Sequence, residues 1–350
     1  MAERKATSFE IAHLAGVSQS TVSRALRNSP LVSEETRERV QRIAKELNYT
    51  VDRMASSLRS GSTNTIALLL FEDPDSDESM INPFFSSMLG SITHASGQLG
   101  YDLLVSFQQL SSDWHTHYQE AHRADGLILL GYGDYNTSRP KLDRLAEVGA
   151  KFVLWGPVNP EQPGSSVGCD NRKGGYLAGK HLLSLGRRKL ALVGDVGASF
   201  PELDARYRGF CEALEESGID PDKIPRIDAE NSDHAGNRAI DVLLSQQPDC
   251  DAIFCVSDII AFGAMRGLLR NGRRIPDDVS VMGFDDISAA AYANPALSTM
   301  RQDARKAGEM MVQLLLETIR GEAPTSQLLD PTLVIRESCG AAKRASAKSD

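Results

Sequence analysis

Apolar positions follow two different periodicities along the chain, and the change falls near residue 62. In residues 1–60 they recur every three or four positions, as on one face of short helices. Beyond this point, short and nearly continuous apolar runs such as IALLL, GLILL and LALVG alternate with amphipathic segments. Parallel strands joined by crossover helices produce that alternation. The pattern therefore predicts a small all-α unit followed by an α/β body.

The apolar runs predict the strands of this body. Because the runs are apolar at successive positions, both faces of the predicted sheets are covered, which is typical of doubly wound parallel sheets and argues against a β-sandwich. A body of this length accommodates two such lobes. The predicted strands are residues 65–71, 102–107, 126–130, 152–155, 189–194, 252–256 and 280–284.

Two short helices separated by a tight turn are predicted in residues 7–26. The Thr7 hydroxyl can cap the first helix while Glu10, three residues on, reaches back to the cap amide. Gly16 permits a tight turn, and Ser18 is a natural N-cap for the second helix. This spacing is that of a helix-turn-helix.

The polar face of the second predicted helix is suited to reading DNA. Its side chains have the lengths that reach base edges or phosphates in a major groove. They are Gln19, Ser20, Thr21, Ser23, Arg24 and Arg27. A third helix is predicted from Ser33, with an acidic first turn and an apolar repeat that closes the small core. The alternative interpretation is an ordinary three-helix subdomain whose polar face is merely solvated.

The segments TSFEIAHLAGVSQSTVSRAL and VSEETRERVQRIAKELNY resemble the lactose and galactose repressor family, in which AxxAGVSxxTVSRxLN precedes VSxxTRxxVxxxAxxLxY. The resemblance implies that one set of side chains on the second helix contacts bases and another set holds phosphates and fixes the register. The implied base contacts are Gln19, Ser20 and Arg24, and the implied phosphate contacts are Thr21, Ser23 and the amide end at Ser18.

Residues 51–62 are predicted to form a hinge helix and linker. In the family, a segment like YxPNxxARSL inserts a leucine between base pairs in the minor groove, and Leu58 occupies that position here. Val51, Asp52 and Ser56 replace the usual proline, asparagine and arginine. These departures leave the leucine in place, and the loss of the arginine is expected to weaken or redirect minor-groove binding. The alternative is that Leu58 only fills a linker.

The net charge of −9 divides unevenly between the two parts of the chain. Residues 1–60 hold ten Lys or Arg against seven Asp or Glu, a net charge of +3, which leaves −12 for the remainder. A basic head and an acidic body orient a molecule on a polyanion, and the modest head charge implies salt-sensitive binding.

Little in the sequence indicates covalent, metal or membrane chemistry. The five cysteines form no CxxC pair, so we expect reduced structural thiols and neither disulfides nor a zinc site. The start has no apolar signal core and no apolar run is long enough to span a bilayer, so we expect a cytoplasmic protein without a membrane partner. GxGxxG and GxxxxGKS motifs are absent and the histidines are scattered. We therefore expect no catalytic residues, no cofactor and no metal.

Candidate ligand-binding residues follow the predicted strands, because ligands of open α/β sheets bind at the carboxyl ends of the strands. They combine aromatic faces, carboxylates and one cation. A sugar suits that combination, since aromatic faces pack against its C–H surfaces while Asp and Arg bond its hydroxyls; a purine would also pack on the aromatics. The candidates are Asn82, Pro83, Phe84, Phe85, Trp155, Arg206, Asp258, Phe284, Asp285 and Asp286.

The segments VSDIIAFGAMRGLLRNGRRIPDDVSVMGFDD and NPALSTMRQD extend the resemblance to the family's effector domain, itself similar to periplasmic sugar-binding proteins. The resemblance implies that Asp258 contacts the ligand, that Arg206 grips it and that Phe84 supplies an aromatic face. Trp155 and Asp285 are further candidates. The alternatives are core packing for the two aromatics, a helix N-cap for Asp258 and a surface ion pair for Arg206.

These patterns predict a helix-turn-helix DNA-binding domain in residues 1–50, a hinge in 51–62, a two-lobed effector-binding and dimerisation domain in 63–340 and a disordered tail in 341–350. We expect a homodimer on a pseudo-palindromic DNA operator, released by a small sugar, with a glucoside or disaccharide favoured. The alternatives are corepression by a purine or other metabolite, and a small-molecule binding module without specific DNA function.

Overall fold

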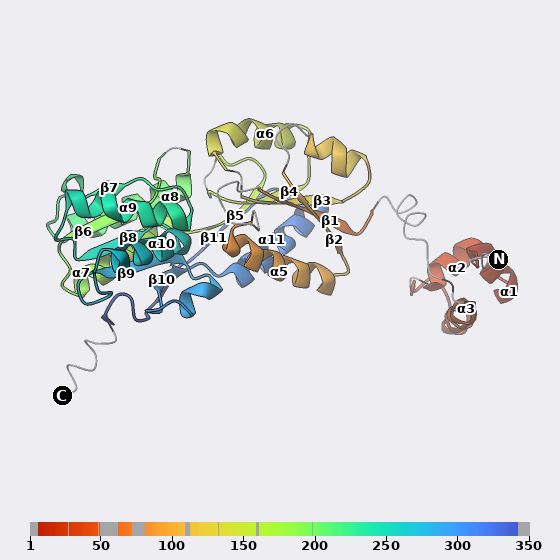
Figure 1. Cartoon of the computed structure of the whole chain (residues 1–350). Helices are drawn as coiled ribbons and strands as arrows, with labels where there is room; N and C mark the ends of the chain where they lie inside the picture. Colours follow the sequence, from red (N-terminus) through yellow and green to blue (C-terminus); the bar gives the residue numbers. More distant parts are fainter. Residues whose placement is uncertain are drawn as a thin grey trace. The chain divides into compact units, whose positions relative to one another are not determined.

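A computed structural model divides the protein into two units, Met1–Thr63 and Asn64–Asp350, each described below by itself (Figure 1). The described residues are 6–26, 28–47, 49, 62–71, 81–108, 113–131, 133–158, 161–197 and 199–341. The predicted minor-groove leucine Leu58, the hinge substitutions around it and all but the first residue of the predicted tail lie outside these ranges.

The first unit contains the predicted helix-turn-helix. Its described helices are α1 (Ser8–Ala15), α2 (Gln19–Leu26) and α3 (Glu34–Glu46). Ile11, Val22 and Val40, one from each helix, are fully buried at the centre of a small core. Since each helix here is short, this shared apolar core provides most of the stability that keeps the helices formed.

Local hydrogen bonds set the boundaries of the first two helices. Thr7 Oγ1 accepts from the backbone N of Glu10 (3.3 Å), and Glu10 Oε2 accepts from the backbone N of Thr7 (2.8 Å), which confirms the predicted capping box. Gly16 ends α1 in a left-handed conformation, with φ of +64°. Ser18 Oγ then accepts from the backbone N of Thr21 (3.2 Å) and caps α2 as predicted.

The second unit is built on two six-stranded sheets, each the centre of one lobe. The first lobe has the strand order β11-β5-β4-β3-β1-β2, with parallel pairs throughout. Its strands are β1 (Thr65–Leu70), β2 (Asp102–Phe107), β3 (Gly126–Leu130), β4 (Phe152–Trp155), β5 (Ser165–Cys169) and β11 (Ser326–Leu329). The second lobe has the order β12-β10-β9-β8-β6-β7, with only β12 antiparallel to its neighbour. Its strands are β6 (Leu190–Val193), β7 (Arg226–Ile227), β8 (Ala252–Cys255), β9 (Ser280–Asp285), β10 (Ser298–Arg301) and β12 (Thr332–Val334).

Helices cover both faces of the first sheet, with α6 above it and α5 and α11 below it in Figure 1. Alternate residues of β1 face the two layers: Ile66 and Leu68 belong to the apolar cluster with α5 and α11, whereas Ala67 and Leu69 belong to the one with α6. The helical segments of the first lobe are α5 (Pro83–Gln98), η1 (His115–Glu120), α6 (Tyr135–Glu147) and α11 (Ala304–Ile319). Those of the second lobe are α7 (Asn171–Ser184), α8 (Pro201–Glu215), η2 (Pro221–Lys223), α9 (Asp233–Gln246), α10 (Asp258–Arg270) and η3 (Ser288–Ala291). The predicted doubly wound α/β class is confirmed.

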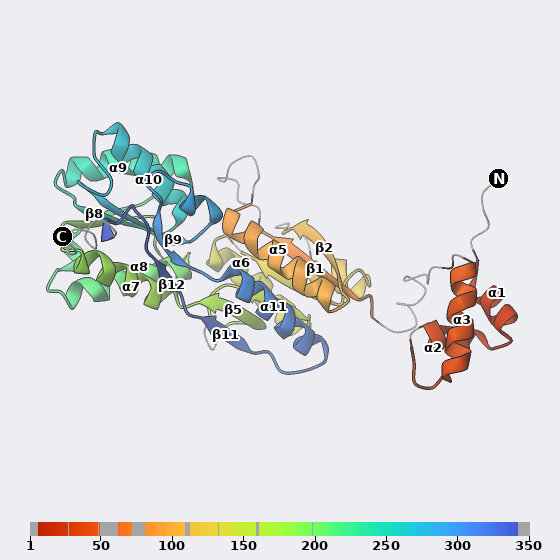
Figure 2. The same ribbon diagram turned by 90° about the horizontal axis from the view of Figure 1, so that it is seen from below.

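The predicted strands are all present, and each boundary agrees within one residue. The prediction missed β5, β7, β10, β11 and β12. Two of these omissions matter for the site, because β5 and β10 lead into places where the chain passes from one lobe to the other. In the described part of the chain these passages lie between β5 and α7, between β10 and α11, and between β11 and β12, and Figure 2 shows them in the middle of the second unit.

Two glycines bring α7 and α8 into close contact. A Cβ at Gly175 would collide with the backbone of Arg206 on α8, and a Cβ at Gly209 would collide with the backbone of Arg172 on α7. The helices can therefore approach closely only because these positions lack side chains. Their contact places the start of α7 beside Arg206.

Gly209→Ala is expected to lower the free energy of unfolding by about 1–3 kcal/mol, because the added methyl forces the two helices apart. Urea unfolding of the purified protein measures this loss. Gly197→Ala is the control, because the Cβ position at Gly197 has open space around it and the residue has no left-handed φ. Gly218 is unsuitable as a control, because its φ of +75° would strain any side chain. An equal loss in Gly197→Ala and Gly209→Ala would contradict the close-packing explanation.

Candidate functional site

The exposed face of α2 is the candidate DNA-reading surface. Val22 and Ala25 are buried on the opposite face, so the helix is fixed against α1 and α3. Ser20 and Arg24 are exposed, whereas Gln19 is half-buried. Arg24 lies in the last turn of α2, and its guanidinium has a planar fork of donors suited to a guanine edge.

Hydrogen bonds already organise the start of α2 before DNA is bound. Ser18 Oγ lies 2.8 Å from both Ser20 Oγ and Thr21 Oγ1. Gln19 Nε2 donates to Ser8 Oγ on α1 (3.0 Å). To make the predicted base contact, Gln19 must therefore either use its amide oxygen as an acceptor or break this bond. Ser23, the other predicted phosphate contact, is half-buried. Leu58 lies outside the described residues.

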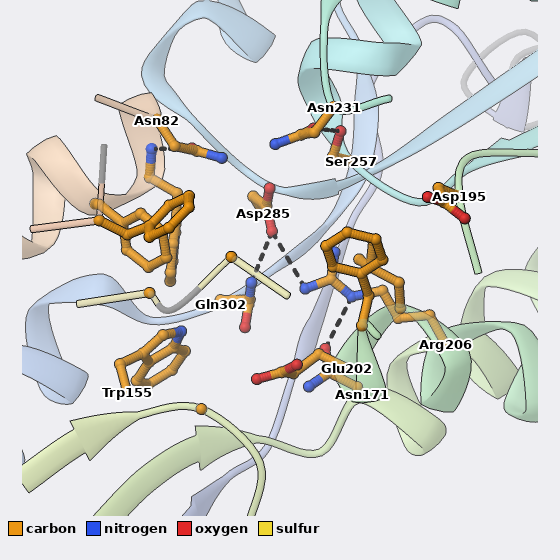
Figure 3. Close-up of a pocket in the computed structure, with 18 of the residues that line it drawn as sticks. Asn82, Trp155, Asn171, Asp195, Glu202, Arg206, Asn231, Ser257, Asp285 and Gln302 are labelled. Atoms are coloured by element: carbon orange, nitrogen blue, oxygen red, sulfur yellow. Dashed lines mark hydrogen bonds and ion pairs between the residues drawn. The ribbon is translucent and has the colours of Figure 1, made fainter. Parts of the chain in front are cut away.

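A cavity of about 400 Å³ lies between the two lobes of the second unit. Its volume is in the range of small-molecule sites. Its lining combines aromatic rings, carboxylates and a single guanidinium. The aromatic residues are Phe71, Phe84, Phe85, Trp155 and Phe200, and the charged residues are Asp134, Asp195, Glu202, Arg206, Glu230 and Asp285. In Figure 3, Trp155 and Asn82 lie on one side of the pocket, and Arg206, Asn171 and Asp195 lie on the other.

The first lobe contributes an aromatic wall. Phe84 packs against Phe85 and Trp155, with both ring-centroid distances at 5.6 Å. Asn82 Oδ1 accepts from the backbone N of Phe84 (2.9 Å) and so caps α5, which begins at Pro83. The start of α5 is therefore fixed where its aromatic residues meet the pocket.

Arg206 of α8 is the central cation of the second lobe. Its Nε donates to Asn171 Oδ1 (2.8 Å), and a terminal nitrogen donates to the Val256 carbonyl. The guanidinium carbon lies 3.7 Å from the centroid of the Phe284 ring, and a terminal nitrogen lies 3.6 Å from Asp285 Oδ1. These contacts hold the plane of the buried guanidinium, so it presents its remaining donors in a fixed direction.

Asp285 links Arg206 to the segment that connects β10 with α11. Its Oδ1 accepts from Gln302 Nε2 (2.6 Å), as Figure 3 shows together with the ion pair to Arg206. Burial raises the pKa of Asp285 to about 6, although Arg206 and Gln302 both act to lower it. The carboxylate is therefore ionised at neutral pH but is poised to take up a proton under mildly acidic conditions.

The remaining polar lining is rich in hydrogen-bond acceptors. Ser257 Oγ donates to Asn231 Oδ1 (2.6 Å), and Asn171 Nδ2 donates to the Cys169 carbonyl (3.0 Å). Burial raises the pKa of Cys169 to about 12, so this thiol stays protonated at neutral pH and is not a nucleophile. The pocket thus presents groups that bind a ligand rather than groups that attack one.

A hydrogen-bonded clasp joins the two lobes at the pocket. The backbone N of Tyr135, at the start of α6, donates to the Ser199 carbonyl in the loop before α8 (2.9 Å). The Ser199 hydroxyl also bonds to the carboxylate of Asp134, which lowers the pKa of that pocket-lining group. Because one partner belongs to each lobe, the clasp must break or change if the lobes move relative to one another.

The structure brings most of the predicted effector-binding residues together. Phe84, Trp155, Arg206 and Asp285 all line the pocket. Asp258 is fully buried and is not among the lining residues, so direct contact between its side chain and a ligand has no geometric support. Phe84 and Trp155 are buried in the apolar cluster of the first lobe and also line the pocket, so the core-packing alternative describes part of their role. Arg206 is buried, so the alternative of a surface ion pair does not fit its position.

Several lining residues were not predicted. Asn171 and Gln302 lie where the chain passes between the lobes, just beyond β5 and β10, and those strands carry no long apolar run. Ser257 directly follows the predicted strand 252–256, so the rule applied to the other strands could have identified it. Asn231 lies in a loop after the two-residue strand β7 and carries no sequence signal.

The described residues contain no group of three or more His, Cys, Asp or Glu side chains placed to hold a metal ion. None of the helices in the described part of the chain has the length and apolar character needed to span a bilayer.

The fold and the pocket define a helix-turn-helix unit joined in one chain to a two-lobed ligand-binding unit, and comparisons with known proteins agree. Residues 9–52 match the model of bacterial regulatory proteins of the lacI family, and residues 180–339 match a periplasmic binding protein-like domain. The chain is 30% identical to the HTH-type transcriptional repressor PurR of Aliivibrio salmonicida, covering 95% of this chain and 98% of that protein. The chain belongs to the LacI family of transcription regulators and is not an enzyme.

Two solved structures extend the comparison over nearly the whole chain. A lac repressor dimer bound to operator and the anti-inducer ONPF matches with a TM-score of 0.81 and 27% identity, covering 96% of this chain and 99% of that one. A complex of the transcriptional regulator CelR with cellobiose matches with a TM-score of 0.70 and 31% identity, covering 95% of this chain and 99% of that one.

Proposed function

We propose that this regulator is a homodimeric repressor that binds a pseudo-palindromic DNA operator and is released from it by a small sugar. The observation that carries the proposal is the pocket between the lobes, where an aromatic wall faces a fixed guanidinium and acceptor groups. That pocket shares a chain with a helix-turn-helix unit whose α2 exposes Arg24. The dimeric state and operator binding of the similar lac repressor support the DNA part of the proposal.

The two sides of the pocket suit the two kinds of surface on a sugar. The rings of Phe84 and Trp155 can pack against C–H groups, while Asp285, Arg206 and Asn171 can bond to hydroxyls. The complex of the similar CelR with cellobiose supports a glucoside or disaccharide as the effector class. Because the proposed operator is DNA inside the cell, we propose that the protein is cytoplasmic.

A purine corepressor is the second candidate. The same aromatic wall would stack a flat base, and the similarity to PurR favours testing it. The carboxylate-rich lining favours a ligand with several hydroxyl donors, so we rank the sugar first.

Effector control is proposed to act through the arrangement of the lobes. A ligand held by Phe84 of the first lobe and Arg206 of the second has different contacts when the lobes shift, so it stabilises one arrangement. The clasp between Tyr135 and Ser199 is a contact that such a shift would change. The first lobe begins with β1, after the predicted hinge in the chain, so a ligand-induced change in the lobes would couple ligand and operator binding reciprocally.

Tryptophan fluorescence can test the ligand class directly. The chain has two tryptophans, Trp114 and Trp155, and only Trp155 lines the pocket. In a Trp114→Phe variant the signal therefore reports from the pocket alone. Saturable changes with cellobiose or another glucoside, and none with hypoxanthine or guanine, would support the sugar. The reverse pattern would favour the purine, and no response to either class would contradict the proposed effector.

Sugar affinity is expected to fall as the pH is lowered through about 6. Asp285 loses its charge near its pKa of about 6, and with it both the ion pair to Arg206 and its full capacity to accept hydroxyl bonds. If the ionised form is the binding form, affinity falls roughly tenfold for each pH unit below that pKa. Titrations of Trp155 fluorescence between pH 5 and 8 measure the profile.

Asp285→Asn is the control, because the amide keeps the shape but does not titrate in this range. Its profile should be flat near pH 6. An unchanged pH dependence in this variant would assign the titration to another group, such as Asp195, whose pKa is also raised by burial and by Asp228.

A further inference from the structure

Asp258 is a buried aspartate next to the pocket that does not line it. It is the first residue of α10 and immediately follows Ser257, whose side chain does line the pocket. The Asp258 side chain is fully buried. Burial raises its pKa well above the ordinary value, and the nearby Asp285 acts in the same direction. A buried carboxyl group of this kind is costly unless its oxygens are bonded, so its partners indicate its role.

Both Asp258 oxygens are bonded to the polypeptide. Oδ2 accepts from the backbone N of Ile287 (2.9 Å), and Oδ1 accepts from Thr299 Oγ1 (2.5 Å). The carboxyl group also lies so close to β9 that a Cβ at Gly283 would collide with it. Asp258 therefore connects the start of α10 to β10 and to the turn that follows β9.

That turn has an unfavourable backbone conformation. Asp285 and Asp286 have φ of +115° and +58°, in the region that favours glycine. Side-chain bonds hold each of them: Asp285 accepts from Gln302, and Asp286 pairs with Arg301 and Arg336 at 2.6 Å each. Strained residues persist only where the surrounding structure holds them.

The backbone amide of Ile287, the next residue, is the one bonded to Asp258. The last residue of β9, Asp285, and the first two residues of the turn, Asp286 and Ile287, are thus each held, and Asp258 provides the bond at Ile287. The first of the three carries the carboxylate that faces Arg206 and the pocket.

We propose that Asp258 is a positioning residue for the effector: by holding the turn after β9 it sets the direction of the Asp285 carboxylate, without touching the ligand itself. The effect on effector binding rests on the proposed function, because the Asp285 carboxylate is part of the proposed effector site. The structural half of the inference is that Asp258 holds the turn after β9 when no ligand is bound, and the functional half is that this improves effector binding. The two halves can therefore be tested separately.

Hydrogen exchange tests the structural half without any ligand. In Asp258→Ala the Ile287 amide loses its acceptor, and amides of residues 285–287 should exchange roughly tenfold faster or more. Asp258→Asn keeps an oxygen to accept from Ile287, while its amide can donate to the Thr299 hydroxyl, so protection should return. Should Asp258→Ala fail to fold, Thr299→Val takes its place, because it removes one of the two partners with little change of shape.

Asp251→Ala is the matched control. The Asp251 carboxylate likewise accepts from backbone amides, those of Arg188 and Lys189, in the same lobe but outside the pocket lining. It should destabilise the protein without changing exchange in residues 285–287. Equal protection of those residues in wild type and Asp258→Ala would overturn the proposal.

Cellobiose titration of the Trp114→Phe protein tests the functional half. Asp258→Ala should weaken binding roughly tenfold or more, Asp258→Asn should restore it to within about threefold of the parent, and Asp251→Ala should leave it unchanged. A loosened turn with unchanged cellobiose affinity would overturn the positioning role. If the parent protein binds neither cellobiose nor any other sugar or purine tested, the proposed effector class fails, and the exchange experiment alone then decides whether Asp258 holds the turn.

Discussion

Arg206→Met is expected to abolish the effector response while leaving operator binding intact. The variant removes the donors to Asn171 and Val256 and leaves Asp285 buried without its cation. In the proposed site the guanidinium also donates to the effector, and hydrogen bonds of a charged group are worth about 1.5–3 kcal/mol each, so loss of these bonds should lower effector affinity roughly a hundredfold or more. Calorimetric titration with the effector, together with operator binding in its absence, measures both quantities.

Two further variants separate the role of Arg206 from general damage. Arg208→Ala removes an exposed arginine of the same helix, paired only at the surface with Asp204, and should change effector affinity little. Arg206→Lys keeps the charge but lacks the planar fork, so it should bind effector much more weakly than the wild type. Normal binding by Arg206→Lys would mean that charge alone suffices, and normal binding by Arg206→Met would move the site elsewhere.

Arg24→Ala is expected to relax operator discrimination. Its exposed guanidinium is the side chain on α2 best suited to a bidentate contact with a guanine edge. Loss of one such contact should reduce the preference for operator over a single-base mismatch by about 1–3 kcal/mol. Competition binding with matched and mismatched duplexes at a fixed salt concentration measures the change.

Arg42→Ala is the control for charge. Arg42 is an exposed arginine on α3 of the same unit, so its removal changes the net charge equally without altering the face of α2. It should weaken binding to all duplexes by a similar factor. Equal discrimination in Arg24→Ala and wild type would refute the predicted base contact.

Most of the strands that the sequence predicts are apolar runs buried on both faces; the edge strand β2, which has no buried residue, is the exception. β5 lacks such a run, yet its Ser165 and Ser166 are buried. Their hydroxyls lie 3.1 Å from Thr318 Oγ1 and 2.7 Å from Ser326 Oγ, respectively. Since both partners are far along the chain, local patterning cannot reveal that these polar residues are satisfied inside a sheet.

Local sequence patterns also could not reveal every contact in the pocket between the lobes. Arg206, Phe84, Trp155 and Asp285 could be proposed because each follows or flanks a recognisable strand. Asp258 also follows one, and only the three-dimensional structure distinguishes a carboxyl group bonded to Ile287 and Thr299 from one that faces the pocket. The helix-turn-helix was more fully predictable, because its caps and turn depend on residues close together in sequence.

Binding of the purified full chain to a symmetric operator from its own upstream region tests the central claim most directly. Fluorescence anisotropy of the labelled duplex should give specific, salt-sensitive binding by a dimer, and cellobiose or another small glucoside should release it. Binding that requires a purine would instead identify a corepressed regulator. The absence of any preference for the operator over a scrambled duplex, with and without ligand, would contradict effector-controlled repression.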